Sequence, residues 1–337
     1  MNNAKNVSYR KTLGFSANKL SNELWQLLHR KRTTKDSLLV FGVGRSGTTL
    51  LMEILYAIPK YRIIFEPLHP AWGTDKDIAG DPELFPYHTL YRRLGEEDPR
   101  LKRYIEKVLT GSISLASPTG ARTSYEVVNR ILKNLSANKI LVKCIRANKI
   151  IHWLAMNFKV RGIYLIIRHP CATIASQIKM GWYPKTQESI RFSKKAIKEL
   201  LLKSVELEDR KDTIINAIER IEEPEEVMAA WWSLDYAIPL YYRSKNLYLL
   251  VYYEHLIENY EDELPRIFNY INMRTPINAY EIIKRPTSTS SSKKIKIKEQ
   301  QSKWRNVLNP KKVEKISKII EKFGLDIYEC NNNKPLK

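Results

Sequence analysis

Short apolar runs alternate with helical stretches along most of this chain. Five runs are continuous enough in Leu, Ile, Val or Tyr to form strands that are buried on both faces: Ser37–Val43, Tyr61–Glu66, Lys139–Cys144, Gly162–Arg168 and Leu247–Tyr253. Helices are expected in the gaps, over Gly47–Ala57, Ser124–Leu135, Lys149–Asn157, Cys171–Lys179, Pro224–Arg243, Glu263–Asn272 and Pro310–Phe323. This alternation predicts an α/β fold with a parallel β-sheet flanked by helices.

Two long segments, roughly 70–122 and 182–222, interrupt the alternation with Pro, aromatic residues and mixed charges. Because neither contains a strand signal, we expect helical or loop insertions there, as acceptor-side insertions or lids. The run Pro286–Ser292 is low in apolar residues and predicts a surface loop. The expected organisation is a basic N-terminal arm, residues 1–35, and a single domain over 36–337.

The formal net charge of +21 is unevenly distributed. Residues 1–36 hold eight Lys/Arg and two acids, and residues 284–318 hold twelve Lys/Arg and two acids. A domain that binds duplex nucleic acid usually spreads its cations over a folded face, so no specific nucleic-acid partner is predicted. The basic flanks leave two other possibilities open, namely peripheral membrane contact and a non-enzymatic protein that binds polyanions.

The three cysteines lie far apart, at Cys144, Cys171 and Cys330, without the spacing of a disulfide framework or a zinc site. No metal site is predicted. The segment Met1–Leu20 has no apolar core of signal-peptide length, and no later window reaches the length of a membrane span. These features predict a cytoplasmic protein without a transmembrane segment.

The sequence SLLVFGVGRSGTTLLMEIL combines a strand, a glycine-bearing turn and an amphipathic helix. This arrangement directs backbone N–H groups toward an anion, because the helix begins directly after the turn. Glycines allow close approach, hydroxyls add donors, and an arginine adds a fixed cation. The candidate binding residues are Gly42, Gly44, Arg45, Ser46, Gly47, Thr48 and Thr49.

The spacing of Gly42 and Gly47 matches the P-loop pattern GxxxxGK[ST] of nucleotide kinases, but Thr48 stands where that pattern has its lysine. The cation lies instead within the turn, at Arg45. No aspartate that could bind magnesium ends a later strand. A P-loop-type sheet that transfers a group from an anionic donor without a metal fits this pattern better than a kinase, which remains the alternative.

The run GVGRSGTTLL resembles the 5′-phosphosulfate loop of sulfotransferases that use 3′-phosphoadenosine 5′-phosphosulfate (PAPS), in the arginine variant of the carbohydrate and tyrosylprotein branches. The resemblance implies PAPS as co-substrate and adenosine 3′,5′-bisphosphate as product. It also implies a catalytic role for Arg45, which would stabilise the charge that grows on the bridging oxygen as sulfur leaves.

The segment GIYLIIRHPCATIASQI resembles the 3′-phosphate element of the same family. In that element, an arginine at the end of a strand and a serine on the next helix bind the 3′-phosphate. Arg168 and Ser176 occupy these positions. Between the two motifs, Lys143 and Arg146 lie near the same edge of the sheet, and their role stays open between ligand contact and salt bridging.

Sulfuryl transfer needs a base that takes the proton of the acceptor. Glu66 is the candidate, because it ends the second strand, and the carboxyl ends of parallel strands are where such sheets bind ligands. Carbohydrate sulfotransferases show a similar Glu-Pro, and Pro67 would hold the carboxylate at the sheet edge. His69 and His152 remain alternatives.

The acceptor and the oligomeric state are not determined by this sequence. A hydroxyl or amine acceptor is expected, with a carbohydrate or a lipid, including a glycolipid, compatible with the resemblance. Four tryptophans could stack on a sugar or on adenine, although core packing is the default for aromatic residues: Trp72, Trp182, Trp231 and Trp232.

Overall fold

The strands of the computed structural model form one five-stranded parallel sheet with the order β2-β3-β1-β4-β5. The structure describes residues 24–28, 33–69, 78, 89–113, 132, 135–285, 302–330, 332 and 334–336. All five predicted strands are confirmed: β1 (Leu38–Phe41), β2 (Tyr61–Phe65), β3 (Lys139–Cys144), β4 (Gly162–Ile167) and β5 (Leu249–Tyr252). Because every pair is parallel, their carboxyl ends share one edge.

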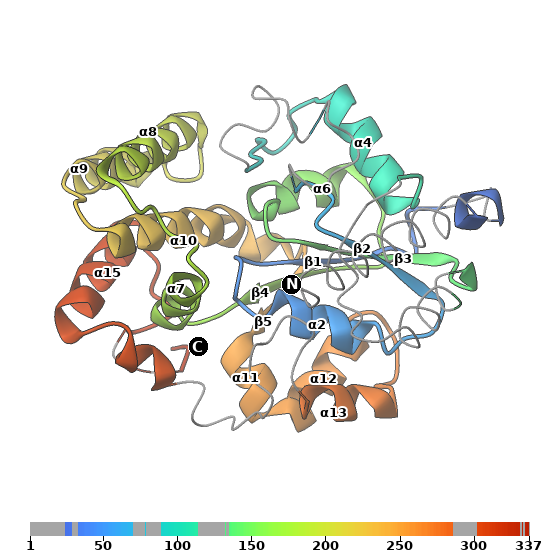
Figure 1. The fold of residues 1–337 in the computed structure, drawn as a ribbon. Helices are drawn as coiled ribbons and strands as arrows, with labels where there is room; N and C mark the ends of the chain where they lie inside the picture. Colours follow the sequence, from blue (N-terminus) through green and yellow to red (C-terminus); the bar gives the residue numbers. More distant parts are fainter. Residues whose placement is uncertain are drawn as a thin grey trace, which may run out of the picture.

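Helices cover both faces of this sheet (Figure 1). Alternate residues of β1 enter different cores, because successive side chains of a strand point to opposite faces. Leu38 and Val40 pack in one core with α2 (Thr48–Leu55), α12 (Tyr260–Asn269) and α13 (Ile277–Ile283). Leu39 and Phe41 pack in the other core, which also contains residues of α4 (Pro99–Leu109), α6 (Ile151–Asn157) and α10 (Pro224–Tyr241).

A second group of helices packs around α10 at one end of the molecule (Figure 1). It consists of α7 (Pro170–Lys179), α8 (Gln187–Lys203), α9 (Lys211–Glu219) and α15 (Pro310–Lys322). The remaining elements are α11 (Tyr253–Glu258), η2 (Asn148–Ile150), η3 (Glu208–Arg210), η4 (Arg243–Lys245) and η5 (Lys303–Asn306). In the part of the chain that the structure describes, no helix is long and apolar enough to cross a membrane.

Within the expected insertion 70–122, residues 99–109 form a helix that packs into the main core. These residues form α4, whose Leu101, Tyr104 and Ile105 lie in the main core because they repeat at helical spacing. The segment 182–222 contains the helices α8 and α9. The predicted loop 286–292 and all of the predicted helix 124–135 except positions 132 and 135 lie outside the described residues. The domain boundary after residue 35 stays a prediction.

Candidate active site

The turn between β1 and α2 contains residues with a positive φ, and at Gly47 there is no room for a side chain. Gly47 has a φ of 99°, and a Cβ atom there would lie 2.4 Å from the ring of Tyr253. Arg45 is not a glycine, yet its φ is 75°. Left-handed conformations of residues other than glycine cost free energy and occur most often at functional sites. The conformation of Arg45 therefore makes this turn a candidate binding site.

Tyr236 of α10 holds the turn against the sheet. Its hydroxyl accepts a hydrogen bond from Val43 N at 3.1 Å and donates one to Ile166 O at 3.0 Å. The ring is fully buried, and burial raises the pKa of the hydroxyl, so it stays protonated and available as a donor. Nothing in the sequence distinguishes this tyrosine from an ordinary core residue.

We expect Tyr236→Phe to loosen the turn without removing any ligand-binding group. The variant leaves Val43 N and Ile166 O without this partner, which should lower the free energy of unfolding by about 1–3 kcal/mol. Denaturant unfolding would measure the change. The matched control is Tyr241→Phe, whose side chain is largely exposed and should have almost no effect. Equal stability of the two variants would contradict the role given to Tyr236.

Two motifs that lie far apart in the sequence meet beside this turn. Arg45 Nε donates a hydrogen bond to Ser176 Oγ at 3.1 Å, and Arg168 donates one to Arg45 O at 3.0 Å. The guanidinium of Arg168 also lies 4.6 Å from the centre of the Tyr253 ring. Arg45, Arg168 and Ser176 therefore form one continuous cluster at the carboxyl edge.

The guanidinium groups of Arg45 and Arg168 lie close enough together for their charges to interact. Burial, followed by the charge of Arg168, lowers the pKa of Arg45, and Tyr253 acts in the opposite direction. Neither guanidinium forms a salt bridge with an acid among the described residues. Adjacent cations repel each other, and a bound anion would relieve that repulsion. The cluster is therefore suited to a polyanionic ligand.

The other residues of the turn offer backbone and hydroxyl groups to a ligand. Gly47 is the N-cap of α2, and no side chain caps this helix, which leaves its first backbone N–H groups available to a ligand. Gln177 Nε2 donates a hydrogen bond to Gly44 O at 2.9 Å, which fixes the opposite side of the turn. Ser46, Thr48 and Thr49 are buried within it.

Glu66 lies at the same edge, directly after β2, but its carboxylate is only 2% exposed. Its Oε1 accepts a hydrogen bond from Lys143 Nζ at 2.5 Å. Its Oε2 accepts two longer ones, from Ile145 N at 3.2 Å and from Arg146 at 3.4 Å. The side chain of Ile145 also lies next to Gly44 in the turn. Lys143 and Arg146 thus both form salt bridges with Glu66, whose carboxylate is buried between them and the sheet edge.

The two histidines considered as bases occupy different environments. His152 is fully buried, where its Nε2 lies 2.7 Å from Arg92 O and its ring stacks on Tyr242. Burial lowers its pKa, so the imidazole is neutral. His69 is half-buried, and its backbone N–H donates to Glu66 O at 3.0 Å.

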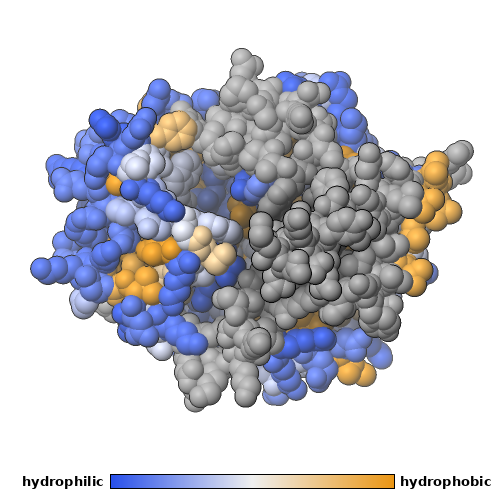
Figure 2. Space-filling model, viewed as in Figure 1, coloured by the Kyte–Doolittle hydropathy of each residue, from blue (hydrophilic) through white to orange (hydrophobic). Residues whose placement is uncertain are grey.

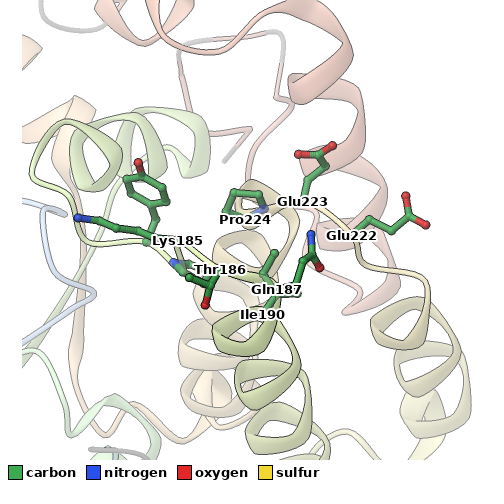
Figure 3. Close-up of a pocket in the computed structure, with 9 residues that line it drawn as sticks. Lys185, Thr186, Gln187, Ile190, Glu222, Glu223 and Pro224 are labelled. Carbon is green, nitrogen blue, oxygen red and sulfur yellow. The ribbon is translucent and has the colours of Figure 1, made fainter.

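A surface pocket of about 550 Å³ lies where α8 and α10 begin (Figure 3). The connection from α7 to α8 contributes Tyr183 and Lys185 to its lining, and Glu222 and Glu223 come from the turn before α10. The preceding residue of that connection, Trp182, is half exposed and lies close to Gly44. The connection therefore joins the rim of the turn to the pocket. Trp232, in contrast, is a core residue.

Among the described residues, no group of three or more His, Cys, Asp or Glu side chains could hold a metal ion. The three cysteines are buried and unpaired.

The family model described as the sulfotransferase domain matches residues 35–326. No curated protein matches the chain. Among solved structures, the sulfotransferase domain of the olefin synthase from Synechococcus PCC 7002 is 15% identical, with 88% of this chain and 97% of that chain covered and a TM-score of 0.44. The sulfotransferase domain from the curacin biosynthetic pathway is 13% identical, with 86% and 99% covered and a TM-score of 0.43.

Proposed function

This chain belongs to the sulfotransferase family, and from that premise we propose that it transfers a sulfuryl group from PAPS to a hydroxyl or amine of an acceptor. The observation that carries the proposal is the cluster of Arg45, Arg168 and Ser176 on a glycine turn, where two neighbouring guanidinium groups form no salt bridge with a described acid. Such a site favours a ligand with several negative charges close together, as in a nucleotide with both phosphosulfate and 3′-phosphate groups.

The donor would be divided between the two motifs. We assign the phosphosulfate to Arg45 and to the turn residues Gly44, Ser46, Gly47, Thr48 and Thr49. Arg168 and Ser176 are assigned to the 3′-phosphate. The hydrogen bond between Arg45 and Ser176 supports this division, because it makes the two sub-sites neighbours in the folded chain, as two groups carried by the same ribose require.

In the proposed reaction, the acceptor oxygen or nitrogen attacks sulfur as the bond from sulfur to the bridging oxygen breaks. That oxygen departs with adenosine 3′,5′-bisphosphate, where Arg45 stabilises its charge. Glu66 takes the acceptor proton. The geometry favours Oε2 for this role, because its two contacts are the longer ones and are easier to exchange for an acceptor. His152 is less suitable, because its Nε2 is already in contact with Arg92 O at 2.7 Å and its ring stacks on Tyr242.

The acceptor class proposed is a carbohydrate or a glycolipid, approaching beside Trp182. A half-exposed indole next to the phosphate turn offers an apolar face to a sugar ring. We propose that the reaction takes place in the cytoplasm.

Calorimetric titration with nucleotides tests the donor. We expect adenosine 3′,5′-bisphosphate to bind more tightly than ADP, because only the former carries the phosphate assigned to Arg168. In Arg168→Met, affinity for the bisphosphate should fall by about 10- to 100-fold, the usual effect of losing a charge-assisted hydrogen bond. Affinity for ADP should change little.

The matched control is Arg103→Met, at an exposed position of α4, which should bind both nucleotides as the wild type does. Equal wild-type affinity for the two nucleotides would refute the proposed donor. Preference for ATP with magnesium would favour a kinase. Loss of all function on removal of residues 1–34, with Arg45→Ala active, would favour a non-enzymatic polyanion-binding protein.

A further inference from the structure

The helical segment 24–28 presents three leucines to solvent. Leu24, Leu27 and Leu28 are 42%, 64% and 68% exposed. Their spacing of three and four residues places them on one face of the helix. Figure 2 shows hydrophobic atoms at the right edge of the molecule, where Figure 1 draws this segment in dark blue. These side chains form a small projecting apolar surface.

Trp25 fixes this segment to the domain. The indole is only 1% exposed, and its Nε1 donates a hydrogen bond to Ala137 O at 2.6 Å. The guanidinium of Arg62 lies 4.5 Å from the ring centre, and Gly111 packs closely against the ring. Because Trp25 is anchored in the core, the exposed leucines are held in place on the surface.

The anchor also places the leucines at the amino edge of the sheet. Ala137 precedes β3 by two residues, and Arg62 is the second residue of β2. Further cations lie along this edge, at the first residue of a strand or up to three residues before it, because neighbouring parallel strands begin side by side. These residues are Lys35, Lys60, Lys139, Lys159 and Arg161, and the one acid among the corresponding positions is Asp36.

The sequence adds a basic run, HRKR at 29–32, directly after Leu28. Leucines beside a group of cations have the composition of surfaces that bind anionic membranes, where apolar side chains enter the interface and Lys/Arg attract the headgroups. A stable protein partner would need an interface of about 1,000 Å² or more, which three leucines alone do not supply. Nucleic acid would use the cations but leave the leucines in water.

We propose that Leu24, Leu27 and Leu28, together with the lysines of the amino edge, form a docking surface for an anionic lipid bilayer. This edge lies opposite the carboxyl ends of the strands, where Arg45 and Arg168 lie. A docked enzyme would therefore keep its candidate active site turned away from the bilayer and open to the donor. This orientation suits a carbohydrate acceptor in solution rather than a glycolipid of the same bilayer, and it does not depend on the identity of the donor.

Co-sedimentation of the full chain with vesicles tests this surface. Wild-type protein should bind vesicles made of equal parts phosphatidylcholine and phosphatidylglycerol at low salt, and should be released as salt screens the charges. It should bind pure phosphatidylcholine vesicles weakly. Leu27→Ser/Leu28→Ser should lower the apparent affinity for the mixed vesicles by at least about tenfold, because two apolar side chains no longer enter the interface.

The matched control is Leu202→Ser/Ile277→Ser, which replaces two leucine-like side chains that are 61% and 83% exposed elsewhere. It should bind vesicles as the wild type does. Both variants should keep their affinity for adenosine 3′,5′-bisphosphate, which separates this result from a failure of the proposed function. The proposal would be overturned if the wild type did not bind the mixed vesicles at low salt, or if Leu27→Ser/Leu28→Ser bound them as tightly as the wild type. A wild-type dimer that the leucine variant converts to monomer would also overturn it, because a second copy would then cover this surface.

Discussion

Replacement of Arg45 by glycine should lower the turnover number for sulfuryl transfer by about 100- to 1,000-fold. This is the usual effect of removing one preorganised donor that stabilises developing charge. The guanidinium is assigned to the bridging oxygen, where negative charge accumulates as sulfur leaves. Transfer of labelled sulfate from PAPS to an acceptor, measured under saturating donor, would give the turnover number directly.

Comparison of Arg45→Gly with Arg45→Ala separates the effect of losing the guanidinium from the effect of the backbone conformation. Because Arg45 has a φ of 75°, Arg45→Ala keeps the strained conformation, whereas Arg45→Gly relieves it and should be more stable by about 1 kcal/mol. If the guanidinium is what matters, both variants lose the same turnover despite their different stability. Arg103→Ala, at an exposed position of α4, is the matched control. Near wild-type turnover in Arg45→Gly would refute the catalytic role.

The sheet could be predicted from the sequence because its strands are buried on both faces. In β1, Leu38 and Val40 enter one core while Leu39 and Phe41 enter the other, so every position had to be apolar. Such runs are visible without any knowledge of their neighbours. The ends of β3 match the predicted ends, and those of the other strands differ from them by at most two residues, because flanking residues continue the pattern but leave the ladder.

The helix α4 was missed although its signal was present. Leu101, Tyr104, Ile105 and Val108 repeat at helical spacing, and Asp98 caps the helix by accepting a hydrogen bond from Leu101 N at 2.8 Å. The mixed charges on its exposed face obscured that pattern. A count of apolar positions at a period of 3.6 residues would have identified it.

The site could be predicted in its parts but not in its assembly. The glycine turn and Arg168 each carry a local pattern, whereas the contact of Arg45 with Ser176 joins residues that are 131 positions apart. Tyr236 is 193 positions from Val43, and the sequence does not show which group the hydroxyl of a buried tyrosine will bind. Contacts of this kind depend on how the helices pack on the sheet, which no local pattern specifies.

Glu66→Gln should affect both turnover and stability, because the carboxylate has two possible roles. As a general base, its loss should lower turnover by about 100-fold or more. As the partner of Lys143, its loss leaves a buried cation without compensation, which should lower the free energy of unfolding by about 3–5 kcal/mol. The single variant measured alone would not separate these effects.

The double variant Glu66→Gln/Lys143→Met separates them. Removing the cation together with the anion should restore most of the stability, since replacing both members of a buried pair is often close to neutral. If Glu66 is the base, turnover stays low in the double variant although the protein is again stable and still binds adenosine 3′,5′-bisphosphate. Recovery of turnover together with stability would instead make Glu66 the structural partner of Lys143. The base would then have to be found elsewhere at the carboxyl edge, with His69, three residues beyond Glu66, the first to test.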